Sequence, residues 1–139
     1  MHEWALAEAV IEATSAALAG RDPSCLRTVT VKLGELQAVD REVFSFALAT
    51  LLRERPFRSA SYALETEPAS FRCASCEREW LLAETPGLGA ETREAIHFLP
   101  EAAHAFVRCP SCGSPDYRVQ AGRGVHIESL TLDTAGPCA

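Results

Sequence analysis

Two pairs of cysteines constrain this chain more than any other feature of its sequence. Cys73 and Cys76 form one Cys-X-X-Cys motif, and Cys109 and Cys112 form a second. Two thiolates on one tight turn can bind an ion at about 2.3 Å, and a second such turn completes the tetrahedral sulfur shell that zinc accepts readily. A redox dithiol would need only one pair. The spacing therefore predicts a structural zinc site.

The two pairs differ in their local sequence. The second pair contains Pro110 and is followed by Gly113, which can adopt a positive φ behind the turn. The first pair lacks such a glycine. Because the pairs lie far apart in the sequence, a bound metal would close a long loop, which is where such a link stabilises most in principle.

The chain has two further cysteines, Cys25 and Cys138. Neither has a partner at ligand spacing, so we expect Cys25 to be a small buried side chain and Cys138 to be a thiol in the tail. A chain of 139 residues with 47% hydrophobic residues can build a core without covalent links. The even number of cysteines therefore does not indicate a disulfide framework.

Composition and charge exclude several classes of protein. The first twenty residues carry three glutamates and no basic segment, so they predict neither a secretory signal nor a membrane span, and we expect a cytoplasmic protein. The net charge of −6 argues against nucleic acid as a partner. Five arginines nevertheless surround the cysteine pairs: Arg72, Arg78, Arg108, Arg118 and Arg123.

Hydrophobic periodicity predicts the order of the elements. Apolar residues at helical spacing predict a helix over residues 3–18 that stops at Gly20, and Asp40 is positioned to cap a second helix that ends before Pro56. Alternating residues predict strands over residues 26–36, 59–67 and 124–132, the last with a change of face near Ser129 that suggests a bulge. A short helix is expected over residues 91–98.

These elements predict an α+β fold with a small three-stranded mixed sheet, two helices on one face and an inserted zinc-knuckle or ribbon module. The helix between the first two strands implies that they are parallel, while the direction of the third strand stays open. We expect residues 1–67 and 119–139 to form the sheet domain and residues 68–118 to form the zinc-binding domain.

The amino terminus offers a second set of metal ligands. With a histidine at position 2, the terminal amine of Met1, a backbone amide and the imidazole of His2 can enter one chelate. Ni(II) and Cu(II) favour such square-planar nitrogen sites, and zinc gains little from them. His2 and Glu3 also begin a zinc-protease HExxH pattern, but Leu6 stands where that motif requires histidine. Protease chemistry is therefore rejected.

Several segments together resemble one family. They are the opening from Met1 to Ala7, the strand from Val31 to Leu36, the two cysteine pairs, and the closing run Gly122-Arg123-Gly124-Val125. This chain resembles the HypA/HybF family of nickel metallochaperones for [NiFe]-hydrogenase maturation, which are not enzymes. The resemblance implies Ni(II) as cargo at Met1, His2 and Glu3, the last through its amide nitrogen or its carboxylate. It also implies structural Zn(II) at Cys73, Cys76, Cys109 and Cys112.

The long segment between the cysteine pairs is similar to the archaeal form of the family. In that segment His97 has two interpretations: a fourth nitrogen ligand of nickel, or a surface histidine packed beside Phe98. We assign no ligand role to His104 or His126.

The resemblance also implies partners, namely the GTPase HypB and the large subunit of a [NiFe]-hydrogenase, with no role for nucleic acid or membrane. The oligomeric state is left open, a homodimer included. The alternative function is a zinc-ribbon adaptor that binds protein or nucleic acid without transferring nickel.

Overall fold

A computed structural model describes residues 2–85, 89–99 and 103–138, without the side chain of His97. The chain forms two compact units. The sheet unit comprises Met1–Lys32, Asp40–Glu65 and Val125–Ala139, and the cysteine unit comprises Leu33–Val39 and Thr66–Gly124. The cysteine unit thus includes residues 33–39, 66–67 and 119–124, which the sequence predicted to lie in the sheet domain.

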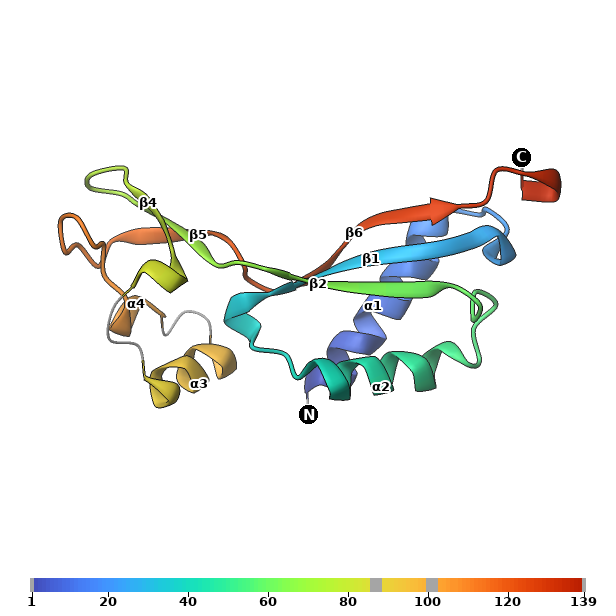
Figure 1. Cartoon of the computed structure of the whole chain (residues 1–139), viewed down its shortest axis with the longest axis horizontal. Helices are drawn as coiled ribbons and strands as arrows, with labels where there is room; N and C mark the ends of the chain where they lie inside the picture. The colour runs from blue at the N-terminus through green and yellow to red at the C-terminus, as the bar shows by residue number, and fades with distance from the viewer. Residues whose placement is uncertain (1, 86–88, 100–102, 139) are drawn as a thin grey trace. The chain divides into compact units, whose positions relative to one another are not determined.

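The sheet unit contains a three-stranded sheet and two helices (Figure 1). The helices are α1 (His2–Leu18) and α2 (Arg41–Leu52), and the strands are β1 (Leu26–Gly34), β2 (Ser61–Glu67) and β6 (Val125–Leu132), in the order β2-β1-β6. Both helices lie on the same face of the sheet. The predicted mixed sheet with two helices on one face is confirmed, although the strand predicted over residues 26–36 ends at Gly34 and continues as a 3-10 turn.

The strand directions follow from Figure 1 and from one backbone contact. Lys32 Nζ of β1 lies 2.6 Å from Glu65 Oε1 of β2, and the two strands run in the same direction, so they are parallel. The Asp133 N–H donates to the Cys25 carbonyl at 2.7 Å, which joins the end of β6 to the start of β1. Strand β6 is therefore antiparallel to β1.

The two helices of the sheet unit each bury an apolar face. Helix α1 buries Ala7, Val10, Ile11 and Leu18, which follow the helical repeat, and it contacts both α2 and β6. Helix α2 buries Phe44, Ala47 and Leu48. Burying each large apolar side chain contributes roughly 1.5–3 kcal/mol.

Local signals fix the ends of the elements. The Asp40 carboxylate accepts the N–H groups of Glu42 and Val43 at 3.1 and 3.2 Å, so the predicted cap of α2 is confirmed. Helix α1 ends at Leu18, and Gly20 beyond it has a φ of +84°. In β6 the less exposed positions change from odd to even numbers after Ile127, which matches the change of face predicted near Ser129.

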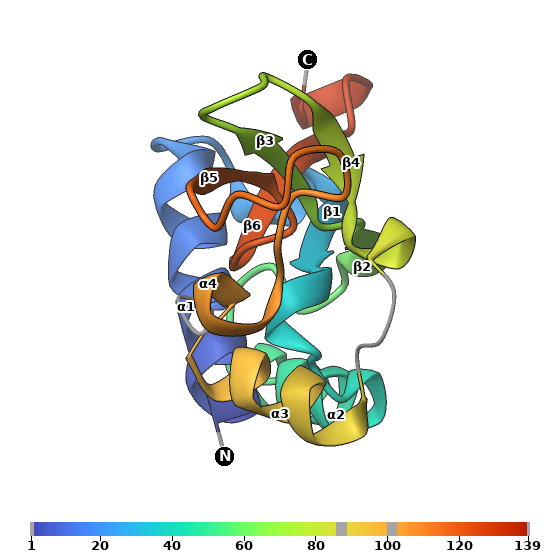
Figure 2. The same ribbon diagram turned by 90° about the vertical axis from the view of Figure 1, so that its left-hand side faces the viewer.

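The cysteine unit contains a second antiparallel sheet, which the sequence patterns did not predict. Its strands are β3 (Ser70–Cys73), β4 (Glu79–Leu81) and β5 (Tyr117–Ala121), in the order β4-β3-β5. Helices α3 (Ala90–Phe98) and α4 (Ala103–Phe106) lie on one side of this sheet (Figure 2). The short helix predicted over residues 91–98 is confirmed as α3.

An aromatic cluster fills the core of the cysteine unit. The rings of Phe71, Trp80 and Tyr117 lie 5.3–5.4 Å apart between centroids, one ring from each strand. Ile96 of α3 and Ala103 of α4 belong to the same core.

The backbone of the run Gly122-Arg123-Gly124 passes close to two other segments, which explains the need for glycine. The N–H of Gly34 donates to the Gly124 carbonyl at 2.8 Å, and the N–H of Leu36 donates to the Gly122 carbonyl at 2.9 Å. A Cβ on Gly122, which has a φ of +87°, would lie 2.3 Å from the Cα of Ala69. Only glycine fits at this position.

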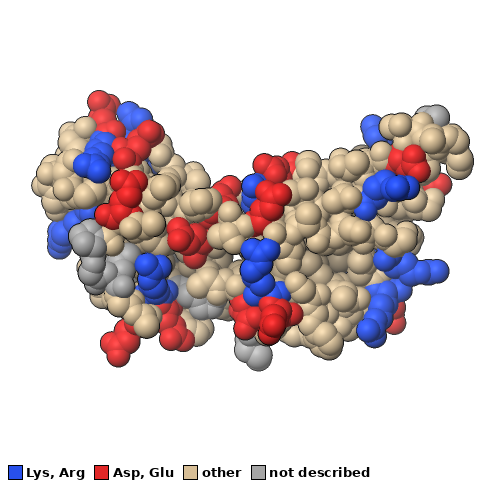
Figure 3. Space-filling model, in the orientation of Figure 1, with Lys and Arg blue, Asp and Glu red and all other residues tan. Residues whose placement is uncertain are grey.

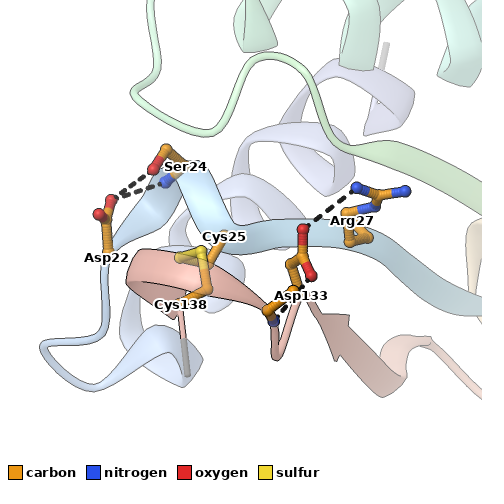
Figure 4. Close-up of a disulfide and its surroundings, with 7 residues drawn as sticks. Asp22, Ser24, Cys25, Arg27, Asp133 and Cys138 are labelled. Atoms are coloured by element: carbon orange, nitrogen blue, oxygen red, sulfur yellow. Dashed lines mark hydrogen bonds and ion pairs between the residues drawn. A yellow bond between two sulfur atoms is a disulfide. The ribbon is translucent and has the colours of Figure 1, made fainter.

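A disulfide joins Cys25 to Cys138 across 113 residues, with the two Cα atoms 5.7 Å apart (Figure 4). Cys25 is buried as expected, but the expectation of a free thiol at Cys138 is wrong. The pairing depends on the antiparallel alignment of β6 with β1, which no local pattern near either cysteine indicates.

No helix within the described ranges is both long enough and apolar enough to cross a lipid bilayer.

Candidate metal centres

The four cysteines of the two pairs come together in the cysteine unit. Their sulfur atoms all lie within 4.8 Å of one another, with 3.5 Å between Cys73 and Cys112 and 3.6 Å between Cys76 and Cys109. A tetrahedral ion with metal–sulfur bonds of about 2.3 Å places its sulfur ligands roughly 3.8 Å apart. A disulfide requires about 2.05 Å. The cluster therefore fits one tetrahedral metal ion and contains no disulfide.

Both turns have the same backbone geometry. In the first, Glu77 N–H donates to the Cys73 carbonyl at 3.0 Å and Cys73 N–H donates to the Arg78 carbonyl at 2.8 Å. In the second, Gly113 N–H donates to the Cys109 carbonyl and Cys109 N–H donates to the Ser114 carbonyl, at 2.9 and 3.1 Å. The residue after each second cysteine has a positive φ, +64° at Glu77 and +73° at Gly113. Glu77 thus occupies the position that glycine occupies in the other turn.

Exchanging these residue types should change stability in opposite directions. Glu77→Gly removes the cost of a positive φ, about 1 kcal/mol, and loses only an exposed ion pair to Arg72 at 3.4 Å. Gly113→Ala introduces that cost without a steric clash, because a Cβ there meets nothing within 4 Å. We expect the free energy of unfolding to rise by up to about 1 kcal/mol in the first variant and to fall by about as much in the second.

Denaturant unfolding of the zinc-loaded protein, followed by the fluorescence of buried Trp80, measures both changes. Two variants shifted in the same direction would contradict the equivalence of the two turns.

The four thiols cannot titrate independently at these distances. Burial raises the pKa of Cys109, but hydrogen bonds from the N–H groups of Cys112 and Ser111 outweigh it and lower that pKa to about 6. The N–H of Ser114 acts to lower the pKa of Cys112, but hydrogen bonding with Cys73, together with burial, raises it to about 12. One thiolate therefore forms readily, and a bound cation would displace the protons that remain.

Carboxylates surround the arginines next to this cluster. Arg72 lies 3.4 and 3.5 Å from Glu77 and Glu79, and Arg78 lies 3.7 Å from Glu84 and donates to Ser111 at 2.8 Å. On the face drawn in Figure 3, basic and acidic side chains of the cysteine unit lie side by side. These guanidinium groups are already matched with negative charge, which disfavours binding of phosphate.

The second candidate centre lies at the start of α1. His2 is the first residue of this helix and is partly exposed, whereas Glu3 is only 7% exposed. Burial acts to raise the pKa of Glu3, but hydrogen bonds to its carboxylate, including those from the N–H groups of Glu3 and Asp40, lower it overall. The structure thus brings together His2, Glu3 and the start of α2. Met1 and the side chain of His97 lie outside the described residues.

Asp40 also contributes to this centre through its N–H, which donates to the Glu3 carboxylate. The sequence predicts Asp40 only as a helix cap, because a cap is a local pattern and the contact with Glu3 joins two distant segments.

Comparison with known proteins identifies the family. Residues 1–132 match the family model described as hydrogenase/urease nickel incorporation, metallochaperone, hypA. This chain belongs to the HypA family.

Relatives named hydrogenase maturation factor HypA agree with this result. The protein of Pyrococcus abyssi is 43% identical over 134 residues, covering 96% of each chain, and that of Pyrococcus horikoshii is 41% identical over 137 residues, covering 98% and 99%. The solution structure of the nickel metallochaperone HypA from Helicobacter pylori has a TM-score of 0.63 at 17% identity and covers 96% of this chain and 98% of its own. At that identity it supports the fold alone.

The match to the HypA family confirms the resemblance inferred from the sequence. The matched range contains His2, Glu3 and all four clustered cysteines, but it ends six residues before Cys138.

Proposed function

We propose that this protein carries Ni(II) at its amino terminus for the maturation of [NiFe]-hydrogenase and holds a structural Zn(II) on Cys73, Cys76, Cys109 and Cys112. The observation that carries the proposal is the family match over residues 1–132, which includes both sets of ligands. The protein is a carrier and not an enzyme, and it works in the cytoplasm.

The cysteine cluster suits zinc in a structural role. Four thiolates complete a tetrahedral shell and leave no open position for water or substrate, whereas a catalytic zinc has three protein ligands and one exchangeable site. Zinc bound here would link the β3–β4 turn to the segment before β5 and so tie together the ends of the second sheet.

The start of α1 suits a nickel ion that must be released again. The N–H groups in the first turn of a helix do not donate to helix carbonyls, so nickel can bind these nitrogens without breaking the helix. The imidazole of His2 is accessible there. We assign the amide nitrogen of Glu3 as a donor because it directly follows His2 in the chain. On binding nickel this amide would give up its hydrogen bond to the Glu3 carboxylate, which keeps the N–H of Asp40 as a donor. With the terminal amine of Met1, the imidazole of His2 and the amide nitrogen of Glu3, three consecutive residues supply three nitrogen donors.

His97 is proposed as the fourth nitrogen donor, which would complete a square-planar site. The proposed partners are the GTPase HypB and the hydrogenase large subunit. The chain itself is proposed to form a homodimer as one of its assemblies.

The alternative function is a zinc-ribbon adaptor that does not carry nickel. A nucleic-acid adaptor is disfavoured by the net charge of −6 and by the carboxylates around Arg72 and Arg78. A protein adaptor would bind one zinc per chain and no nickel, whereas a carrier binds an exchangeable nickel in addition to the zinc.

Equilibrium dialysis tests the proposal. Untagged, zinc-loaded protein dialysed against Ni(II) should bind one exchangeable nickel per chain while its zinc content stays at one per chain. Adding one residue before Met1 should weaken nickel binding, because the terminal amine then lies outside the chelate. A protein that binds no nickel, or that exchanges zinc for it, contradicts the proposed carrier.

A further inference from the structure

The Cys25–Cys138 disulfide links the segment before β1 to the segment after β6, at one end of this strand pair. Cys25 lies in a 3-10 turn (Pro23–Cys25) directly before β1, and Cys138 lies in a 3-10 turn (Gly136–Cys138) after β6. Both cysteines belong to the sheet unit. The loop that the bond closes contains α2, β2 and the whole cysteine unit.

Few other described contacts hold this end of β6. The Asp133 N–H donates to the Cys25 carbonyl at 2.7 Å, and Asp133 Oδ2 lies 3.4 Å from Arg27 Nη1 (Figure 4). That ion pair is exposed, at 66% for Arg27 and 38% for Asp133, and exposed pairs contribute little. The disulfide therefore adds a covalent link at the end of β6, where the pairing of β6 with β1 stops.

The two cysteines differ in exposure. Cys25 is 4% exposed, whereas Cys138 is partly exposed and is preceded by four exposed residues, 134–137. A surface hollow lined by Arg21, Asp22, Leu132 and Thr134 reaches both cysteines. An attacking thiolate can therefore approach the sulfur of Cys138.

We infer that Cys25 and Cys138 form a reversible thiol–disulfide clasp that a dithiol reductant opens and that controls how firmly β6 is held on β1. One thiolate of the reductant attacks Cys138 Sγ, the Cys25–Cys138 bond breaks, and Cys25 leaves as a thiolate. The second thiol of the reductant then attacks the mixed disulfide, which releases Cys138 and leaves the reductant as a disulfide. The two protons of the dithiol pass to the two cysteines.

The clasp separates the six cysteines into two chemical sets. Four must be thiolates to bind metal, while two are oxidised in the same chain. The disulfide lies beside Arg21 and Asp22, which follow the carboxyl end of α1, whereas His2 is the first residue of that helix. The clasp itself does not depend on nickel binding.

Counting thiols tests the bond. Zinc-loaded, full-length protein prepared without reductant is denatured with a chelator and alkylated with iodoacetamide. We expect four alkylated cysteines and a peptide that links Cys25 to Cys138, and six alkylated cysteines after dithiothreitol. When the reduced, folded protein is treated with oxidised glutathione before denaturation and alkylation, the count should return to four. Six alkylated cysteines without reductant, or no return to four, would overturn the inference.

Stability and hydrogen exchange test what the bond does. Reduction should lower the melting temperature of the sheet unit by about 10 °C or more, because the bond closes a loop of over 100 residues. It should speed amide exchange at Asp133 and in the adjoining turns. Cys138→Ser without reductant should reproduce both changes and respond no further to dithiothreitol, with zinc content constant. Reductant could instead act on the zinc thiolates. Amide exchange would then become faster throughout the cysteine unit, or Cys138→Ser would respond to dithiothreitol as strongly as the unaltered protein, and either result would overturn the inference.

Discussion

Replacing Cys73 by serine should release zinc and unfold the cysteine unit while the sheet unit keeps its fold. Structural zinc contributes about 10–16 kcal/mol in zinc-finger peptides, as much as or more than the roughly 5–15 kcal/mol by which a typical domain is stable. The core of the cysteine unit, built around Phe71, Trp80 and Tyr117, is too small to compensate for that loss.

Zinc content and hydrogen exchange measure this result unit by unit. Protection should disappear across β3, β4 and β5 and persist in α1, α2 and β1. Ser75→Ala is the matched control, since Ser75 lies in the same turn but its side chain makes only an exposed contact of 3.3 Å with Ser114. Unchanged protection in the cysteine unit of Cys73→Ser would contradict the structural role of the cluster.

Acid should release zinc from the unaltered protein as well. Zinc binds thiolates, so each thiol that is protonated in the free site must lose its proton, and affinity falls as pH falls. Above its pKa of about 6, Cys109 enters as a thiolate. Below that pH its proton also has to be displaced, and the decline in affinity should become steeper.

Replacing His2 by alanine should abolish high-affinity nickel binding and leave zinc content and folding unchanged. The imidazole is proposed as a donor within the chelate, and loss of an outer-sphere partner alone typically costs 10–100-fold in metal affinity, so we expect a loss of at least about 100-fold. Folding should survive because His2 is the first residue of α1 and is not among the buried core side chains.

Isothermal titration with Ni(II) on the zinc-loaded protein measures this loss. His126→Ala is the matched control, because it removes an exposed imidazole from β6 of the same unit. Equal loss in both variants, or retained affinity in His2→Ala, would rule out the amino-terminal site. His97→Ala should weaken nickel binding less and make its pH dependence shallower, since one fewer imidazole competes with protons.

Patterns that lie within a few residues of one another were sufficient to predict much of this fold. The spacing of apolar residues gave α1 and α2, the Asp40 side chain gave the start of α2, and alternation gave the strands and the change of face in β6. These features are encoded locally because side-chain periodicity and capping depend only on neighbouring residues. The two Cys-X-X-Cys pairs indicated the cluster for the same reason.

Features made by distant segments needed the tertiary structure. The sequence alone determined the identity and spacing of the metal-binding groups, the main helices and strands, and the family. Only the fold decided that Glu77 adopts a glycine-like conformation, that Asp40 donates to Glu3, that residues 33–39 join the cysteine unit, and that Cys138 meets Cys25. The contact between Asp40 and Glu3, the place of residues 33–39 and the pairing of Cys138 with Cys25 depend on how distant helices and strands pack, which is set by the whole chain. The positive φ of Glu77 arises in a short turn, but no glycine marks it in the sequence.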